Sequence, residues 1–236
     1  MMRRILVGAL GVSALALSAG AATAAYAGVT ALDCPAREGA LIRVAQAADG
    51  RSCDYQGEAG ETVRLKLVPL EGRTASEAMA PTKAELQALV PVYRRSAPDV
   101  DRDEPGDRAD IDLPFFHIHT VGDRTDVKMF GVKVRSEGEN ADVNVGHGHR
   151  HAVVHAGREG AEVSAEDVGR TNTSLVYVLA ADRRAPSGYW TVGYVAKGPA
   201  AGPLVVGEFR ATTKRHSHNA GDHGDIGRLI DRNVKG

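Results

Sequence analysis

The stretch from Ser174 to Ala211, SLVYVLAADRRAPSGYWTVGYVAKGPAAGPLVVGEFRA, contains three apolar runs separated by turns rich in Gly and Pro. The runs cover residues 175–180, 189–195 and 204–209 and consist largely of Val, Leu, Tyr and Ala. Short runs of β-branched and aromatic residues bounded by Gly and Pro are typical of neighbouring β-strands. We therefore predict a C-terminal β meander over residues 171–212 that forms the best-packed core, with the N-terminal strands as candidates to complete it.

An N-terminal β module with a short helix is expected over residues 28–92. Short strands are predicted at 41–46 and 52–56, and apolar and charged side chains alternate along 62–70 as in a half-buried strand. The segments 74–77 and 82–85 both have the spacing of a helix capping box, and Pro81 would fit the first turn of a helix that starts at the second one. The pattern predicts one short helix whose apolar edge contains Leu86, Leu89 and Val90.

Cys34 and Cys53 are the only two cysteines of the chain. The predicted strands 41–46 and 52–56, with a turn at Asp49-Gly50 between them, would return the chain so that the two sulfurs meet. The chain has no C-x-x-C pair and no His beside either Cys, which disfavours a reactive or redox cysteine. We predict a structural disulfide.

The middle of the chain changes in composition. Residues 93–113 are rich in Asp, Arg and Pro and predict an acidic linker. In residues 114–170, the acid-Val pairs Asp126-Val127, Asp142-Val143 and Glu162-Val163 lie 16 and 20 residues apart, each after a polar turn that contains Gly. This spacing suits a Val-rich β repeat, which would form either a small solenoid or an ordinary antiparallel sheet. The predicted fold is therefore mainly β, built from antiparallel meanders, this repeat and one short helix.

Segments of the repeat carry a family resemblance. Gly131–Val134, Asp142–Gly146 and Glu162–Ser164 resemble the rungs of secreted bacterial adhesin β-repeat domains, over about 50 of 236 residues. The rest of the chain is similar to uncharacterised exported proteins of proteobacteria, which implies a location in the cell envelope. Neither resemblance supplies catalytic residues, and the His-rich stretch 147–155 departs from smooth rungs.

Residues 1–27 have the features of an export signal. Arg3 and Arg4 precede an apolar stretch, and Ala25-Tyr26-Ala27 matches the small-x-small pattern that precedes signal cleavage. A membrane anchor is the competing interpretation, but no stop-transfer charges follow, and no other apolar run has the length of about 20 residues that a membrane helix needs. Cleavage would leave a periplasmic or secreted protein with a net charge of about −3 and no stable membrane span, which disfavours nucleic acid as a partner.

Histidine clusters are the most specific chemical signal. On a strand, residues i and i+2 lie on one face, so an H-x-H pair presents two imidazoles to one Zn, Ni or Cu ion. A solvated strand or tail that binds metal only adventitiously is the alternative, since Gly146 and Gly148 interrupt the central cluster. The candidate metal ligands are His117 and His119, then His147, His149 and His151, and then His216 and His218 in a predicted flexible tail, 213–236.

Enzyme motifs are missing from the sequence. It contains no G-x-S-x-G elbow, no H-E-x-x-H zinc motif and no Gly-rich loop that opens a helix. We therefore expect an exported envelope module that binds an unidentified envelope component or has a structural role, without enzymatic activity and without a cofactor. The alternative is a periplasmic protein that binds Zn, Ni or Cu through the H-x-H clusters.

Overall fold

The structure is a computed structural model. It describes residues 29–91 except 59, then 108–113, 116–121, 124–129, 132–137, 141–157, 160–213 and 221–234. The predicted export signal and most of the predicted linker lie outside these residues. The strands of the described part are β1 (Arg37–Glu38), β2 (Leu41–Gln46), β3 (Ser52–Gln56), β4 (Thr62–Val68), β5 (Arg108–Leu113), β6 (Phe116–Val121), β7 (Arg124–Met129), β8 (Val132–Glu137), β9 (Ala141–His147), β10 (Arg150–Gly157), β11 (Gly160–Val168), β12 (Asn172–Ala181), β13 (Thr191–Pro199) and β14 (Leu204–Ala211).

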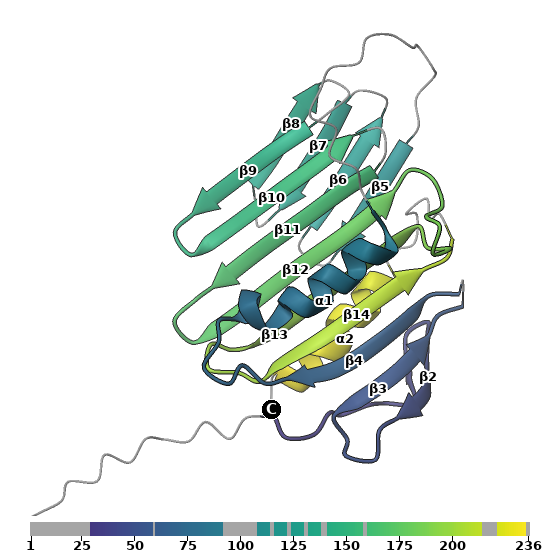
Figure 1. Ribbon diagram of the computed structural model, residues 1–236, viewed down its shortest axis with the longest axis vertical. Coiled ribbons are helices and arrows are strands. Elements are labelled where there is room, and N and C mark those ends of the chain that lie inside the picture. Colours follow the sequence, from purple (N-terminus) through teal and green to yellow (C-terminus); the bar gives the residue numbers. More distant parts are fainter. Residues whose placement is uncertain are drawn as a thin grey trace, which may run out of the picture.

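One large antiparallel sheet organises the described part of the chain. Its strand order is β1-β2-β3-β4-β14-β13-β12-β11-β10-β9 (Figure 1). The N-terminal strands join the C-terminal meander where β4 pairs with β14, from Leu204↔Val68 to Arg210↔Thr62. The mainly β fold and the predicted C-terminal meander are confirmed, and the N-terminal strands do extend that meander.

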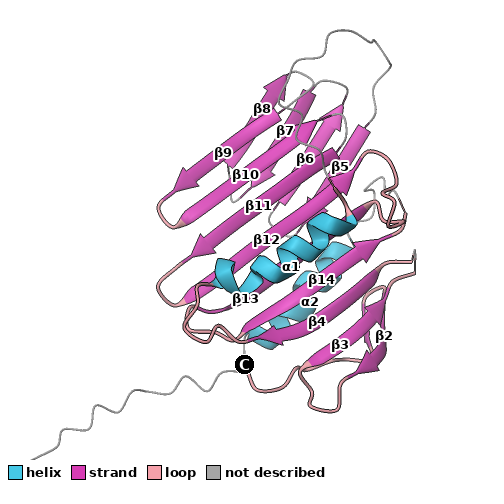
Figure 2. Cartoon of the chain, in the orientation of Figure 1, coloured by secondary structure: helices cyan, strands magenta, loops and turns pink. Residues whose placement is uncertain are grey.

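Two helices cover opposite faces of this sheet (Figure 2). Helix α1 (Ala75–Leu89) contacts β12 and β13, and its residues Met79 and Leu86 are buried with Tyr177 and Leu204 of the sheet. Helix α2 (Gly221–Val234) contacts β13, β14 and β4 on the other face. Because β12, β13 and β14 are buried on both faces, they are continuous apolar runs instead of alternating ones.

A second, four-stranded antiparallel sheet has the order β5-β6-β7-β8. Figure 1 shows it behind β9–β12, on the side of α2, and β5 contacts that helix. On this side Val154 of β10 and Val163 of β11 are fully buried, in the same apolar cluster as Leu229 of α2. The molecule thus has a back layer made of this sheet and α2, the large sheet in the middle, and α1 in front.

The segment predicted as a β repeat, 114–170, forms ordinary antiparallel pairs and no solenoid rungs in its described residues. Its strands are divided between two sheets, since β6–β8 belong to the smaller sheet and β9–β11 to the larger. The last six residues of the predicted linker, Arg108–Leu113, are not a linker but form strand β5.

The prediction of one short helix and a flexible C-terminal tail is wrong in two respects. Residues 221–234 of the predicted tail form α2, whose Ile226, Leu229 and Ile230 recur at helical spacing and are buried. Helix α1 begins at the first capping box, where the Thr74 hydroxyl accepts a hydrogen bond from the Glu77 N–H and the Glu77 carboxylate accepts one from the Thr74 N–H. Pro81 therefore lies inside α1 and not in its first turn.

The predicted disulfide is present. Cys34 and Cys53 are bonded, with their Cα atoms 6.5 Å apart, and both residues are buried in the cluster that α2 covers. Helix α2 also holds the segment before β1, because Asn233 accepts a hydrogen bond from the Asp33 N–H at 2.7 Å and donates one to the Asp33 carbonyl at 3.0 Å. Asp33 and Asn233 thus join two segments far apart in the sequence at the α2 face of the sheet.

Candidate functional site

The smaller sheet has two chemically distinct faces. The backbone register assigns its residues to alternate faces, because paired residues of neighbouring strands share a face and successive residues do not. Positions on one face are apolar or uncharged: Ala109, Ile111, Leu113, Phe116, Ile118, Thr120, Thr125, Val127, Met129, Val132, Val134 and Ser136. Except for Val121, the positions on the other face are charged or His: Arg108, Asp110, Asp112, His117, His119, Arg124, Asp126, Lys128, Lys133, Arg135 and Glu137. We call this second face the charged face.

Both histidines of the first predicted cluster occupy the charged face, next to acidic residues. His119 of β6 pairs with Asp110 of β5 on one side and with Asp126 of β7 on the other. His117 pairs with Asp112 of β5 and with Lys128 of β7. Directly paired residues have Cβ atoms about 5 Å apart, and residues i and i+2 of a strand lie about 7 Å apart. Two His and three Asp therefore occupy neighbouring register positions on one face of the sheet.

This combination of residues suits a transition metal. Imidazole nitrogen and carboxylate oxygen bind Zn²⁺ at about 2.0–2.2 Å, and two His with one acid form a common ligand set that leaves a coordination position open. Imidazole ligands also suit Ni²⁺ and Cu²⁺. Acidic residues beside the His positions would offset part of the charge of a bound dication.

The second predicted cluster is divided by a hairpin turn. Strand β9 ends at His147 and β10 begins at Arg150, with Gly148 in the turn at φ 62°. The register pairs His147 with Arg150 and Gly146 with His151, so positions 147 and 151 lie on opposite faces of the sheet. The i, i+2 rule fails here because the chain reverses direction between the histidines, and the structure does not bring the three together on one face.

His149 has a different neighbour. Its Nε2 lies 3.2 Å from Oδ1 of Asp167, and its side chain is 58% exposed. Arg150 approaches the same carboxylate, with Nε 3.0 Å from Oδ2. His216 and His218 lie outside the described residues. Among the side chains that the structure does describe, no group of three or more His, Cys, Asp or Glu could hold a metal ion.

A second polar group lies beside α1 on the large sheet. Glu162 of β11 is buried, and its Oε1 accepts a hydrogen bond of 3.0 Å from the Tyr177 hydroxyl. Lys83 of α1 lies 3.9 Å from the same carboxylate oxygen and 4.6 Å above the Tyr177 ring. Burial, followed by the charge of Glu162 and the hydrogen bond to it, raises the pKa of Tyr177, so this phenol stays protonated.

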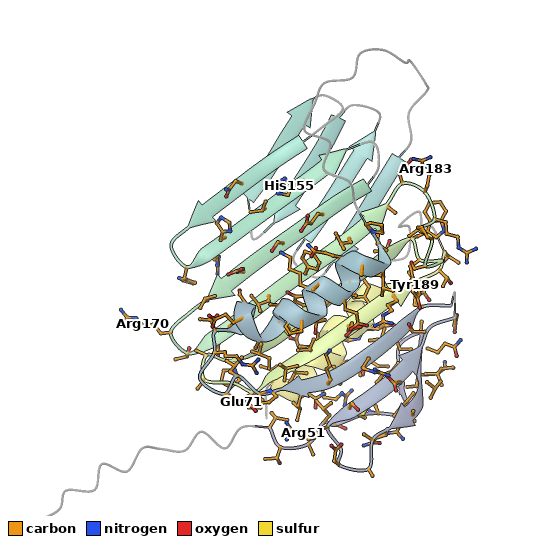
Figure 3. All side chains as sticks on the ribbon, in the orientation of Figure 1. Arg51, Glu71, His155, Arg170, Arg183 and Tyr189 are labelled. Atoms are coloured by element: carbon orange, nitrogen blue, oxygen red, sulfur yellow. A yellow bond between two sulfur atoms is a disulfide. The ribbon has the colours of Figure 1, made fainter. Side chains whose placement is uncertain are left out.

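The strands beyond Glu162 are not covered by α1. His155 of β10 pairs with Glu162 and His151 pairs with Glu166, and Figure 3 labels His155 on this open part of the sheet. The Ser76 hydroxyl of α1 donates a 3.0 Å hydrogen bond to Glu166. These contacts position α1 over the sheet, and we assign Glu162, Tyr177 and Lys83 a structural role.

Sequence reasoning identified His117 and His119 but missed the acids beside them. Asp110 and Asp112 fall in the predicted linker, and Asp126 in an acid-Val pair of the predicted repeat. The missed signal is the succession of D-x-D, H-x-H and D-x-K at 110–112, 117–119 and 126–128, joined by short turns. Glu162 could not be identified from sequence, because its burial depends on the position of α1.

No helix in the described part of the chain is long and apolar enough to cross a membrane. None of the protein-family models, curated proteins and solved structures gives a significant match to this chain.

Proposed function

We propose that the protein is an exported binding module of the cell envelope, without enzymatic activity, that holds a transition-metal ion on the charged face of β5–β8. His117 and His119 would bind the ion, with Asp110, Asp112 and Asp126 as the neighbouring carboxylates. The observation that carries this proposal is the register of β5, β6 and β7, which pairs each His with an Asp. Zn²⁺, Ni²⁺ and Cu²⁺ are the ions that such ligands suit.

A periplasmic or secreted location is part of the proposal. The buried Cys34–Cys53 disulfide supports it, because protein disulfides persist mainly outside the reducing cytoplasm.

Access of an ion to the charged face is supported by the cost of burying charge. One face of the smaller sheet must pack against the large sheet, where Val154 and Val163 are fully buried. Removal of an unpaired charged group from water costs several kcal/mol or more, whereas the apolar face gains about 25 cal/mol per Å² that it buries. We infer that the apolar face packs inward, which leaves the charged face open to ions.

The test uses the full, disulfide-bonded protein, purified without an affinity tag or a metal column. Bound Zn, Ni and Cu are measured by mass spectrometry, and Zn²⁺ affinity is measured by calorimetric titration. We expect one ion per chain, lost in the double variant His117→Ala/His119→Ala. Asp110→Asn/Asp126→Asn should weaken Zn²⁺ binding by about tenfold or more, while the fold is checked by circular dichroism.

The hairpin histidines supply the matched control. His149→Ala/His151→Ala also removes two imidazoles, but from β9–β10, and should retain the ion with unchanged affinity. If the His117→Ala/His119→Ala variant instead binds Zn²⁺ as the unmodified protein does, the proposed site is wrong. Loss of the ion only in the hairpin variant would move the site to the second cluster.

A further inference from the structure

Three charged pairs join β7 and β8 on the charged face, and one of them differs from the other two in the signs of its charges. Arg124 pairs with Glu137, and Asp126 pairs with Arg135, so two pairs join opposite charges. The next pair on the same face joins Lys128 to Lys133. Like charges directly opposite each other on antiparallel strands are destabilising. This lysine pair is therefore a site of concentrated positive charge.

The lysine pair is also next to the proposed metal ligands. Lys128 pairs with His117 across β6 and β7, so the row of paired residues is Asp112, His117, Lys128 and Lys133. A dication bound at His117 would be the largest local charge and would add to that of the lysines. Asp112 and Asp126 offset part of this charge, but no acid pairs with Lys128 or Lys133 in the register of β6–β8.

We propose, on the basis of that metal site, that Lys128, Lys133 and Arg135 bind an oxyanion, a phosphate or a carboxylate, beside the metal. Neighbouring strands are about 4.8 Å apart, so β6 and β8 are about 10 Å apart. The row therefore places the position of Lys133 about 10 Å from that of His117, with Lys128 between them. A metal held by two His and an acid keeps an open coordination position, which an oxygen of the anion fills.

The natural ligand of the charged face is accordingly a metal ion together with an oxyanion. Two sources have this chemistry. The anion is either free in the surroundings and binds after the ion, or it arrives already coordinated to the ion as an anionic chelate. In both cases Lys128 and Lys133 favour the anionic complex over the bare ion. Their positive charge attracts the anion and repels a dication that carries no anion.

The test measures binding of inorganic phosphate by calorimetric titration, first to metal-free protein and then to protein loaded with Ni²⁺. We expect phosphate to bind both forms, and the Ni²⁺-loaded form about tenfold more tightly, because coupled ligands strengthen each other. Lys128→Gln/Lys133→Gln should abolish phosphate binding to the metal-free form and weaken it by about tenfold or more in the Ni²⁺-loaded form. The same variant, without ligands, should unfold at a higher temperature than the unmodified protein, since the repulsion between the lysines is gone.

The matched control removes two positive charges elsewhere. Arg170→Gln/Arg183→Gln changes two exposed arginines in the loops at the two ends of β12 (Figure 3) and should bind phosphate normally. Equal phosphate affinity of the lysine variant and the unmodified protein would overturn the anion site. The two proposals fail separately. Phosphate binding through Lys128 and Lys133 without Ni²⁺ binding would support the anion site and contradict the proposed metal function.

A second arm separates the two sources of the anion. The protein is mixed with preformed Ni²⁺-citrate, and the bound species are counted by native mass spectrometry. Binding of nickel and citrate together supports capture of a chelate, and binding of nickel with phosphate added later supports a free anion. Nickel bound with neither anion, in the presence of both, contradicts the anion site.

Discussion

Asp225 of the C-terminal helix lies directly against Gly39, although the two residues are 186 positions apart. A Cβ atom at Gly39 would overlap both carboxylate oxygens of Asp225. The same carboxylate accepts a 2.7 Å hydrogen bond from the Ala40 N–H and pairs with Arg228. Glu38, the residue before Gly39, accepts hydrogen bonds from Arg228 and Arg232, both of 2.9 Å. Helix α2 is therefore fixed to the β1–β2 turn by a buried polar group as well as by apolar contacts.

Gly39→Ala should destabilise the protein by about 3 kcal/mol, because it adds both backbone strain and a clash with a buried charge. Gly39 has a φ of 57°, a conformation that costs other residues about 1 kcal/mol. The control is Gly72→Ala, since Gly72 has a φ of 80° but nothing within 4 Å of an added Cβ. We expect a loss of only about 1 kcal/mol there. If urea denaturation shows the same loss of stability for Gly39→Ala and Gly72→Ala, the close contact of Asp225 with Gly39 is contradicted.

Removal of the disulfide should lower stability by about 3 kcal/mol, because it closes a short loop in the unfolded chain. Cys34 and Cys53 are 19 residues apart in the sequence. The double variant Cys34→Ser/Cys53→Ser should have the lower midpoint in urea, and a reducing agent should lower the midpoint of the unmodified protein to a similar value. A reducing agent should leave the double variant unchanged, and any effect there would show that the loss has another cause.

The local features of this fold were predictable, and the long-range ones were not. The apolar runs of β12–β14, the Cys34–Cys53 loop and the Thr74 capping box each depend on residues close together in sequence. The pairing of β4 with β14 joins residues more than 130 positions apart, and no local pattern specifies it. Helix α2 was missed because its glycines have low helix propensity, and packing of Ile226 and Ile230 against Gly207 compensates for that cost.

The candidate site divides in the same way. The H-x-H pattern at His117 and His119 was visible in the sequence, because alternation along one strand is a local property. Their acidic neighbours became identifiable only when the register paired Asp110 and Asp126 with His119. The prediction for 147–151 assumed one continuous strand, and the hairpin at Gly148 removed the basis for it.

Glu208 should make stability depend on acid pH. It is buried, and although burial alone raises the pKa of a carboxyl, hydrogen bonds from Arg210 and Lys66 outweigh it and hold the pKa of Glu208 below its usual value. The ionised carboxylate therefore stabilises the fold above the pKa of the unfolded chain, and this contribution disappears as the pH falls through the lower pKa of the folded state. Glu208→Gln should cost about 2 kcal/mol at neutral pH and progressively less in acid.

Urea denaturation of both proteins over a series of pH values measures this difference. A matched control is Asp54→Asn, because Asp54 pairs with Arg64 at 2.7 Å but both side chains are exposed. Exposed pairs contribute little, so the control should differ from the unmodified protein by less than about 1 kcal/mol at every pH. A difference for Glu208→Gln that stays constant down to low pH would contradict the assigned cause.

The hydrogen bond between Tyr177 and Glu162 should contribute to the position of α1. Tyr177→Phe removes the hydroxyl donor from a buried carboxylate and should cost about 1–2 kcal/mol. A double-mutant cycle with Glu162→Leu, which removes the acceptor, isolates the pairwise energy, for which we expect about 1 kcal/mol. Additive losses in the cycle would show that the two groups do not interact in solution.

Pro81→Ala should stabilise the protein, although it changes a residue in the middle of α1. Proline has no N–H to donate to the carbonyl of Glu77 and is about 3 kcal/mol less favourable than Ala inside a helix. Proline also restricts the unfolded chain, so its replacement by Ala loses up to about 1 kcal/mol of this gain in stability. The side chain of Pro81 is exposed, so its removal sacrifices little packing. We expect a net gain of about 1–2 kcal/mol in urea denaturation.

Glu85→Ala, a second substitution of an exposed residue of α1, should give no gain because it restores no backbone hydrogen bond and removes the ion pair with Arg210. A loss of stability in Pro81→Ala would mean that α1 is interrupted at this position instead of continuous from Ala75 to Leu89.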